Sequence, residues 1–153
     1  MRNGRGRFIH YNGDMYEGEW KNDTKHGRGK YIIGDGGKFD GDIYEGEYVD
    51  GLWSGKGTYT WKDGRKYVGQ WEKDKQNGQG VMSWPSGKKY DGCWKNGLFH
   101  GKGVLSWSNG EILDGYWKDH KQHGTFTHTY PNGSKYQEEW SNGKKQTNDC
   151  TIF

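Results

Sequence analysis

The sequence YVGQWEKDKQNGQGVMSWPSGKK, residues 67–89, is one copy of a unit that recurs along the whole chain. Each copy begins with the pattern Tyr-x-Gly-x-Trp or a close variant of it. The copies begin at Tyr16, Tyr44, Tyr67, Tyr90, Leu113 and Tyr136. The first spacing is 28 residues and every later spacing is 23 residues. A fixed period of this length indicates a repeat architecture, in which each unit packs only against its neighbours.

A second pattern, His-Gly-x-Gly or a variant, follows every start except the last. Its copies are HGRG (26–29), SGKG (54–57), NGQG (77–80), HGKG (100–103) and HGTF (123–126). Residues 3–6, NGRG, keep the same phase, so we predict one array over 1–145. It comprises a half repeat at 1–15, five repeats at 16–43, 44–66, 67–89, 90–112 and 113–135, and a half repeat at 136–145. The longer first unit carries five extra residues, for which we expect a bulge or an extended turn, and 146–153 are expected to form a flexible tail.

Each unit is predicted to be a β-hairpin. Strand alternation places Tyr67, Gly69 and Trp71 on one face, and Val68 and Gln70 on the other. Asp-Gly, Ser-Gly and Asn-Gly pairs supply the residues that tight turns require. One face therefore alternates aromatic residues with glycine, and the other is mostly polar. The glycines leave room for the tryptophan rings to lie flat on the backbone, and burying each ring contributes about 1.5–3 kcal/mol.

The composition excludes several classes of protein. Glycine contributes 28 residues, tryptophan 9 and tyrosine 11, but only 29% of residues are hydrophobic, which argues against a broad aliphatic core. The high aromatic content argues against a disordered chain. A net charge of +3, with acids and bases interspersed, provides no basic stripe for nucleic acid. Two distant cysteines suit a reducing compartment, and the first residues form no apolar signal segment, so we expect a cytoplasmic protein.

The two patterns together resemble the MORN repeat (membrane occupation and recognition nexus), and the resemblance covers residues 3–145. It implies an all-β fold, namely an elongated, twisted, open-ended single antiparallel sheet of successive β-hairpins with the aromatic residues on a concave side. About 12 strands at ~4.8 Å each would make a rod ~60 Å long. Three positions near the carboxyl end depart from the pattern. Leu113 replaces the tyrosine, and Phe126 and Glu138 replace glycines, as expected where terminal units cap an array.

The aromatic columns are the strongest candidate for a binding site. A single layer of sheet cannot cover both of its faces, so part of the aromatic face is expected to stay accessible. Tryptophan and tyrosine are also favoured where proteins bind one another. We therefore predict that the columns both stabilise the array and form a groove for a helix or an extended peptide of a partner protein. The predicted groove residues are Tyr16, Trp20, Tyr44, Tyr48, Trp61, Tyr67, Trp71, Trp84, Tyr90, Trp94, Trp107 and Trp117.

The last four residues, Cys-Thr-Ile-Phe, fit the C-a-a-X signal for prenylation of Cys150. A terminal phenylalanine favours a geranylgeranyl over a farnesyl group. The alternative is a chance match on a frayed tail. One prenyl chain holds a membrane only weakly, so stable anchoring requires a second contact. Basic residues near equivalent turns are candidates for contact with anionic lipid. They are Lys62, Arg65, Lys66, Lys88 and Lys89.

No catalytic pattern is found, so we expect neither an enzyme nor a cofactor, and no small-molecule substrate. His120, His123 and His128 lie near one another in sequence, but no clear ligand set is completed, so no metal is expected. The pattern favours a non-catalytic scaffold that binds a partner protein and is tethered to the cytoplasmic face of a membrane by a prenyl group. Two alternatives remain, namely a structural subunit of a ciliary or other cytoskeletal assembly, and a module that binds anionic phospholipid.

Overall fold

The computed structural model describes residues 1–34 and 40–146. Within these residues every regular element is a β-strand. The strands are β1 (Gly4–Ile9), β2 (Met15–Lys21), β3 (Thr24–Ile32), β4 (Ile43–Val49), β5 (Leu52–Thr60), β6 (Lys66–Glu72), β7 (Lys75–Ser83), β8 (Lys89–Lys95), β9 (Leu98–Ser106), β10 (Ile112–Lys118), β11 (Lys121–Thr129), β12 (Lys135–Ser141) and β13 (Lys144–Lys145). The extra residues of the first unit fall largely on 35–39, and Cys150 falls in 147–153, so the predictions for both lie outside the described residues.

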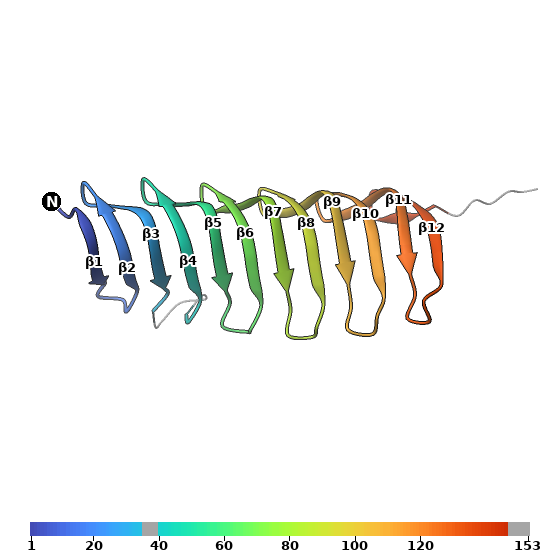
Figure 1. The fold of residues 1–153 in the computed structure, drawn as a ribbon, viewed down its shortest axis with the longest axis horizontal. Coiled ribbons are helices and arrows are strands. Elements are labelled where there is room, and N and C mark those ends of the chain that lie inside the picture. The colour runs from blue at the N-terminus through green and yellow to red at the C-terminus, as the bar shows by residue number, and fades with distance from the viewer. Residues whose placement is uncertain (35–39, 147–153) are drawn as a thin grey trace, which may run out of the picture.

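The strands form one sheet in which each strand pairs with the next along the chain, from β1 to β13. Every pairing is antiparallel, so the fold is a succession of hairpins. Figure 1 shows the hairpins side by side in an elongated array, with turns along both long edges and β1 and β12 near opposite ends. The predicted fold, a single open antiparallel sheet of successive hairpins, is confirmed.

Two kinds of turn alternate along the array. The wider turns carry the predicted Asp-Gly, Ser-Gly and Asn-Gly pairs, as between Trp61 and Arg65, where Gly64 has a φ of 88°. The tighter turns form the other edge, and the repeat spacing did not predict them. They place two successive residues at positive φ, as at Asn96 (50°) and Gly97 (81°), which is the geometry of a type I′ hairpin turn.

A β-bulge interrupts each full hairpin at the second sequence pattern. In β7, Asn77, Gly78 and Gln79 lie opposite the single residue Gln70 of β6. Gly78 has a φ of 95°, which residues with a side chain rarely adopt. The side-chain carbonyl of Gln70 accepts the backbone N–H of Gln79 at 2.8 Å and holds the bulge. A glutamate carboxylate makes the same bond in the first two full hairpins.

The tyrosine that begins a unit fills the space left by glycines. The ring of Tyr67 lies over the cross-strand pair Gly69 and Gly80, and a Cβ added to Gly69 would come 2.5 Å from the tyrosine Oη. The hydroxyl donates to the carbonyl of Gln70 at 3.0 Å. Trp71 packs edge-on against the Tyr67 ring, with the ring centroids 5.1 Å apart. The sequence prediction assigned this space to tryptophan, but the ring that occupies it belongs to tyrosine.

Burial of these rings changes the acidity of the phenols. Burial raises the pKa of Tyr16 to about 12, because the phenolate would lose its hydration. The pKa of Tyr67 and of Tyr90 is raised by the same cause. The interior tyrosines are therefore held neutral well above physiological pH.

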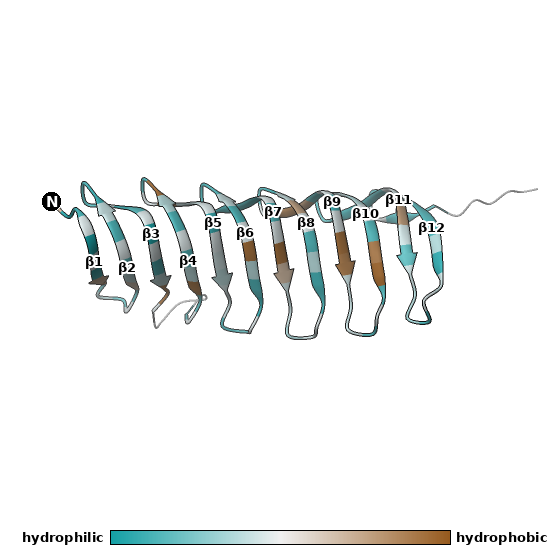
Figure 2. Cartoon of the chain, viewed as in Figure 1, coloured by the Kyte–Doolittle hydropathy of each residue, from teal (hydrophilic) through white to brown (hydrophobic). Residues whose placement is uncertain are grey.

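The residue type in the interior changes along the array. Tyr31 and Tyr59 pair with the first tyrosine of their units, whereas Met82 and Leu105 take the equivalent places in β7 and β9. In Figure 2 the brown segments within the strands lie on β6, β7, β9 and β10, which agrees with more aliphatic residues in this part of the array. The amino-terminal half thus relies on aromatic rings alone, and the later units add aliphatic side chains.

Candidate protein-binding surface

The structure divides the twelve predicted groove residues into two groups. Nine are buried, with no more than 8% of their surface exposed. They are Tyr16, Trp20, Tyr44, Tyr48, Tyr67, Trp71, Tyr90, Trp94 and Trp117. Trp61, Trp84 and Trp107 are only partly buried and pack against this interior. The prediction gave these residues two roles, in stability and in a groove, and the assignment of the nine buried residues to a groove needs correction. Rings of neighbouring units cover one another, so only Trp61, Trp84 and Trp107 of the twelve stay accessible.

The indole N–H groups distinguish the two sets of tryptophans. Trp71, Trp94 and Trp117 each donate to the carbonyl of a glycine on the preceding strand, at 2.9–3.1 Å. Within the described part of the chain, the indole N–H groups of Trp84 and Trp107 have no protein acceptor, and neither nitrogen is buried. An exposed donor beside an apolar ring is suited to bind a group from outside the chain.

Trp61, Trp84 and Trp107 follow directly after β5, β7 and β9, where the wider turns begin. We call these three residues the tryptophan ladder. Its rungs are two strands apart, which corresponds to about 9.6 Å along the array. The Arg65 guanidinium lies 5.0 Å from the Trp61 ring, and Lys88 Nζ lies 5.2 Å from the Trp84 ring and 5.6 Å from the Trp107 ring. The ladder is therefore both aromatic and cationic.

Among the interior aromatic residues that the sequence prediction missed, Trp53 and Phe99 occupy equivalent positions. Trp53 stacks on Tyr44, with ring centroids 4.4 Å apart, and Phe99 stacks on Tyr90 at 3.7 Å. Each is the second residue of its strand, directly after a tight turn. The position of that turn determines their contact with the tyrosine. The Asp-Gly and Asn-Gly pairs that precede them could therefore have predicted this contact from the sequence.

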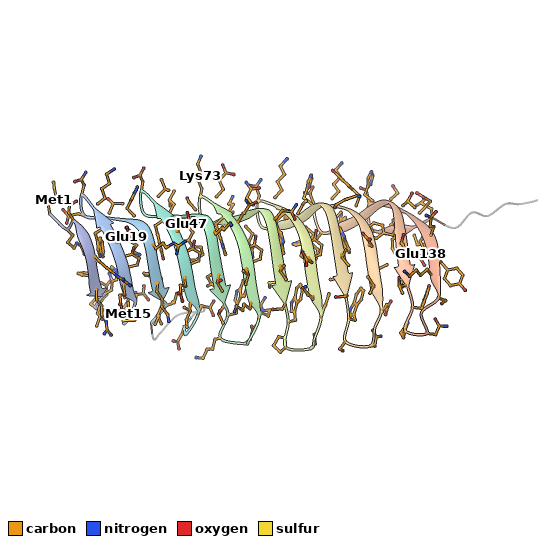
Figure 3. The ribbon with its side chains drawn as sticks, in the orientation of Figure 1. Met1, Met15, Glu19, Glu47, Lys73 and Glu138 are labelled. Carbon is orange, nitrogen blue, oxygen red and sulfur yellow. The ribbon has the colours of Figure 1, made fainter. Side chains whose placement is uncertain are left out.

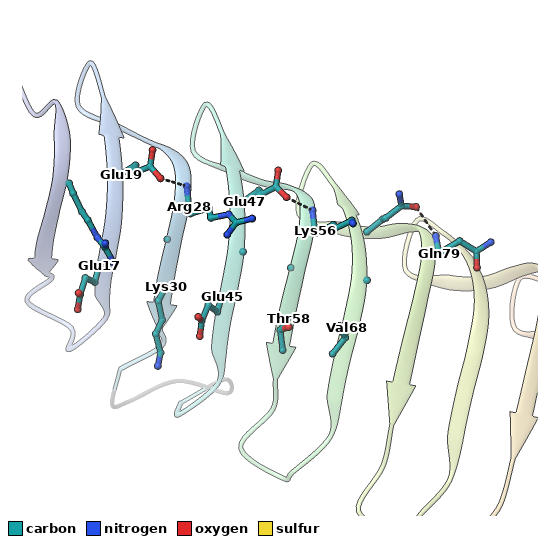
Figure 4. A pocket seen from close by; sticks show the side chains of 16 residues that line it. Glu17, Glu19, Arg28, Lys30, Glu45, Glu47, Lys56, Thr58, Val68 and Gln79 are labelled. Atoms are coloured by element: carbon teal, nitrogen blue, oxygen red, sulfur yellow. Dashed lines mark hydrogen bonds between the residues drawn. The ribbon is translucent and has the colours of Figure 1, made fainter.

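A hollow of about 760 Å³ lies on the polar face, over β1 to β7. Figure 4 shows its charged side chains, which alternate in sign from strand to strand, with acids on β2, bases on β3 and acids again on β4. They are Arg5, Glu17, Glu19, Arg28, Lys30, Glu45, Glu47 and Lys56. The accessible hollow is thus on the face opposite to the predicted aromatic groove. Opposite charges on neighbouring strands attract each other, so the stability of the sheet accounts for this arrangement.

A cluster of charged side chains closes the last unit around Glu138, which lies near the carboxyl-terminal end of the array (Figure 3). Only 4% of the Glu138 side chain is exposed. Its Oε1 accepts from Lys145 Nζ at 2.7 Å and from the Tyr130 hydroxyl at 3.3 Å, and lies 3.1 Å from Nδ1 of His128. His128 Nε2 lies 2.8 Å from the carboxylate of Glu111. The glutamate that departs from the repeat pattern is thus fully compensated by neighbouring donors.

The Glu138 cluster predicts a loss of stability in acid. Burial raises the pKa of Glu138, but hydrogen bonds from Lys145 and His128 more than offset this effect, so the pKa lies below its ordinary value of 4.5. Such a carboxylate stabilises the fold fully above the unfolded pKa, and this stabilisation is lost as pH falls through the native pKa. We expect the urea midpoint to fall as pH drops below about 4.5. Glu138→Gln should be less stable at pH 7 and show a smaller fall in acid; equal pH profiles would contradict the assignment.

Among the described residues, no helix is long and apolar enough to cross a membrane. In the same part of the chain, no group of three His, Cys, Asp or Glu side chains is placed to hold a metal ion. The three neighbouring histidines have separate surroundings. Nδ1 of His120 accepts the backbone N–H of Phe99 at 3.2 Å, His123 is exposed, and His128 belongs to the Glu138 cluster.

An open sheet of similar hairpins, each packed only on the next, defines a repeat protein rather than a globular domain with one core. The family model described as "MORN repeat" matches residues 1–15, 16–38, 44–64, 67–89, 90–112 and 114–135. The chain therefore belongs to the MORN-repeat family. A search of curated proteins finds no match to the chain.

Among solved structures, the fold is similar to the TCP domain of SAS-4 (dCPAP) of Drosophila melanogaster, in complex with a proline-rich motif of Ana2 (dSTIL). The TM-score is 0.56, and the match covers 87% of this chain and 70% of that chain. The two sequences are 14% identical, so the likeness is one of fold alone.

Proposed function

We propose that this chain is a non-catalytic scaffold that binds an extended segment of a partner protein along the tryptophan ladder. The observation that carries the proposal is the pair of exposed indole donors on Trp84 and Trp107, each beside a partly buried ring. An extended peptide presents backbone carbonyls that can accept from such donors, and its side chains can pack on the rings. The ladder thus offers apolar contact and hydrogen bonding at the same points.

The family and the fold add independent support. Membership of the MORN-repeat family favours a repeat scaffold, since the matched units account for most of the sheet. The Drosophila TCP domain, which has a similar fold, is solved with a proline-rich motif bound. That ligand belongs to the Drosophila protein, and the exposed indole donors are the reason to propose peptide binding here.

A library of random peptides displayed on phage tests the proposed surface. Peptides enriched on the wild-type chain are expected to bind Trp84→Ala at least about tenfold more weakly, because buried tryptophan contacts dominate the affinity of such interfaces. Tyr116→Ala is the matched control, since it removes a ring that is 48% exposed on the polar face. Near-ultraviolet circular dichroism establishes that both variants are folded. Peptides that bind all three proteins equally would place the binding site elsewhere.

A lipid anchor at Cys150 is a separate proposal, supported by the sequence Cys-Thr-Ile-Phe alone. We propose a geranylgeranyl group there, which would locate the scaffold at the cytoplasmic face of a membrane. Intact-mass measurement of the native protein identifies both its carboxyl terminus and any added lipid. Cys150→Ser is expected to move the protein from the detergent phase to the aqueous phase, and unchanged partitioning would contradict the anchor.

Two alternative proposals concern location and lipid. Co-fractionation with axonemes rather than membranes would favour a structural subunit of a ciliary or cytoskeletal assembly. Binding to anionic vesicles that weakens with added salt would favour direct lipid contact through the basic turns, since salt screens exposed charges.

A further inference from the structure

The spacing of the tryptophan ladder discriminates between conformations of a bound segment. Its rungs are about 9.6 Å apart, as expected for positions separated by two strands. A polyproline II helix rises about 3.1 Å per residue and repeats every three residues, or about 9.3 Å. Every third residue of such a helix would therefore face the next rung of the ladder. From the first rung to the third, the length of the peptide and the length of the ladder would differ by less than about 1 Å.

The other common conformations fit this spacing poorly. An α-helix returns to nearly the same side after seven residues, which corresponds to a rise of about 10.5 Å, so its side chains would lie about 2 Å out of phase over three rungs. Side chains on one face of a β-strand lie about 6.6 Å apart and drift out of phase after one rung. The period alone thus favours polyproline II among the conformations open to a peptide.

The chemistry of the rungs agrees with the spacing. A proline ring is compact and apolar and packs on aromatic side chains, and the carbonyls of a polyproline II helix have no hydrogen-bond partner within the helix. The free indole N–H groups of Trp84 and Trp107 are donors for such carbonyls. The ammonium of Lys88 lies between these two rings, within 5.6 Å of both, and Arg65 lies beside Trp61. The Arg65 Nε already pairs with the Asp63 carboxylate at 2.7 Å, so Lys88 is the cation that favours an acidic residue on the ligand.

We infer that the tryptophan ladder binds an acidic polyproline II segment with proline at every third residue. This inference rests on the proposed peptide-binding function and names the ligand of the same surface. Successive prolines contact Trp61, Trp84 and Trp107, and a ligand carboxylate lies near Lys88. The segment lies across the strands, along the length of the array.

The test uses the full chain and synthetic peptides that lack tryptophan. The probe is Ac-(Pro-Pro-Glu)4-amide. Its isomer PPEEPPPEEPPP has the same composition, but it has no proline that is followed by prolines both three and six residues later. The indole region of a ¹H–¹⁵N spectrum reports the contact. The Trp84 and Trp107 indole signals are expected to shift on addition of the probe, while those of the interior residues Trp71 and Trp94 stay in place.

Affinities measured by titration complete the test. Trp84→Ala and Trp107→Ala are each expected to weaken binding of the probe about tenfold or more, and Tyr116→Ala to leave it unchanged. Trp84→Phe, which keeps a ring but removes the N–H, should fall between wild type and alanine. Lys88→Glu should favour (Pro-Pro-Lys)4 over the acidic probe, which reverses the wild-type preference.

Each contrary result has a distinct meaning. Equal binding of the probe and its isomer would overturn the three-residue period. Display ligands that need Trp84 but contain no proline would overturn the inference and leave the proposed function standing. Failure to find any peptide that needs the ladder would overturn both. Shifts of the Trp84 and Trp107 signals with phosphatidylserine vesicles, and none with peptide, would assign the ladder to a lipid surface instead.

Discussion

Substitution of Gly80 by alanine is expected to destabilise the array by about 2–3 kcal/mol, because the new methyl group would overpack the interior. An added Cβ would come 2.5 Å from two ring carbons of Tyr67, far inside van der Waals contact. The ring cannot move away, since it is fully buried and its hydroxyl is bonded to the carbonyl of Gln70. Gly80 does not have a positive φ, so backbone strain adds nothing to the effect.

Gly6 provides the matched control. It occupies the same place in the half repeat, but no tyrosine ring covers it, and an added Cβ would meet Trp20 at an ordinary distance of 3.7 Å. Gly6→Ala is expected to stabilise the protein slightly, by less than about 1 kcal/mol, because alanine restricts the unfolded chain. Urea unfolding monitored by tryptophan fluorescence compares the two variants. Similar losses at both positions would show that glycine is required there by the backbone, and not by the tyrosine ring.

The fold was predictable because its determinants repeat in the sequence. Tyr67, Gly69 and Trp71 alternate with polar residues, and the same alternation recurs along the array. A position whose strand face is ambiguous in one unit can therefore be assigned from the other units. The β-bulge was not predictable from alternation, because Gly78 serves the backbone whereas Gly80 makes room for a ring. Both are simply glycines in the sequence pattern. Only the positive φ of Gly78 distinguishes its role from that of Gly80.

The accessible part of the aromatic face was harder to predict than the fold. Trp71 and Trp84 belong to columns with the same period and the same residue type. Trp71 lies within a strand, beside Gly57, whose missing side chain lets the indole reach a backbone carbonyl. Trp84 lies just beyond the end of β7, where the array offers its N–H no acceptor within the described residues. The distinction depends on strand ends, which are the least regular feature of the repeat.

In the last full unit, the large aromatic ring of the tyrosine–glycine arrangement comes from the second strand of the hairpin and not from the first. Leu113 stands in the tyrosine position, and Phe126 stands in the glycine position that pairs with Gly115. A Cβ added to Gly115 would come 2.6 Å from the Phe126 ring, so this ring occupies the space that tyrosine fills elsewhere. Phe126 is fully buried and meets Trp117 edge-on at 5.2 Å, as Tyr90 meets Trp94 at 5.3 Å. The two departures from the pattern thus compensate each other.

This compensation predicts strong coupling between Leu113 and Phe126. Phe126→Gly alone is expected to cost about 3–5 kcal/mol, since it empties the interior over Gly115. Leu113→Tyr alone is expected to cost about 1–3 kcal/mol, because its ring would compete with Phe126 for one space. The double variant restores the arrangement of the other units, and its hydroxyl gains the carbonyl of Tyr116 as an acceptor. We expect it to be at least about 2 kcal/mol more stable than the sum of the single effects predicts.

Urea denaturation of the wild type, the two single variants and the double variant gives the coupling energy directly. The measurement is decisive because the two explanations of Phe126 predict different results. If Phe126 substitutes for the missing tyrosine, each single change is harmful and the second change rescues the first. If Phe126 only adds apolar surface near the end of the array, the two losses should add, and the double variant should be the least stable of the four proteins. Additive losses would therefore show that the two departures in the last full unit are independent of each other and do not compensate each other.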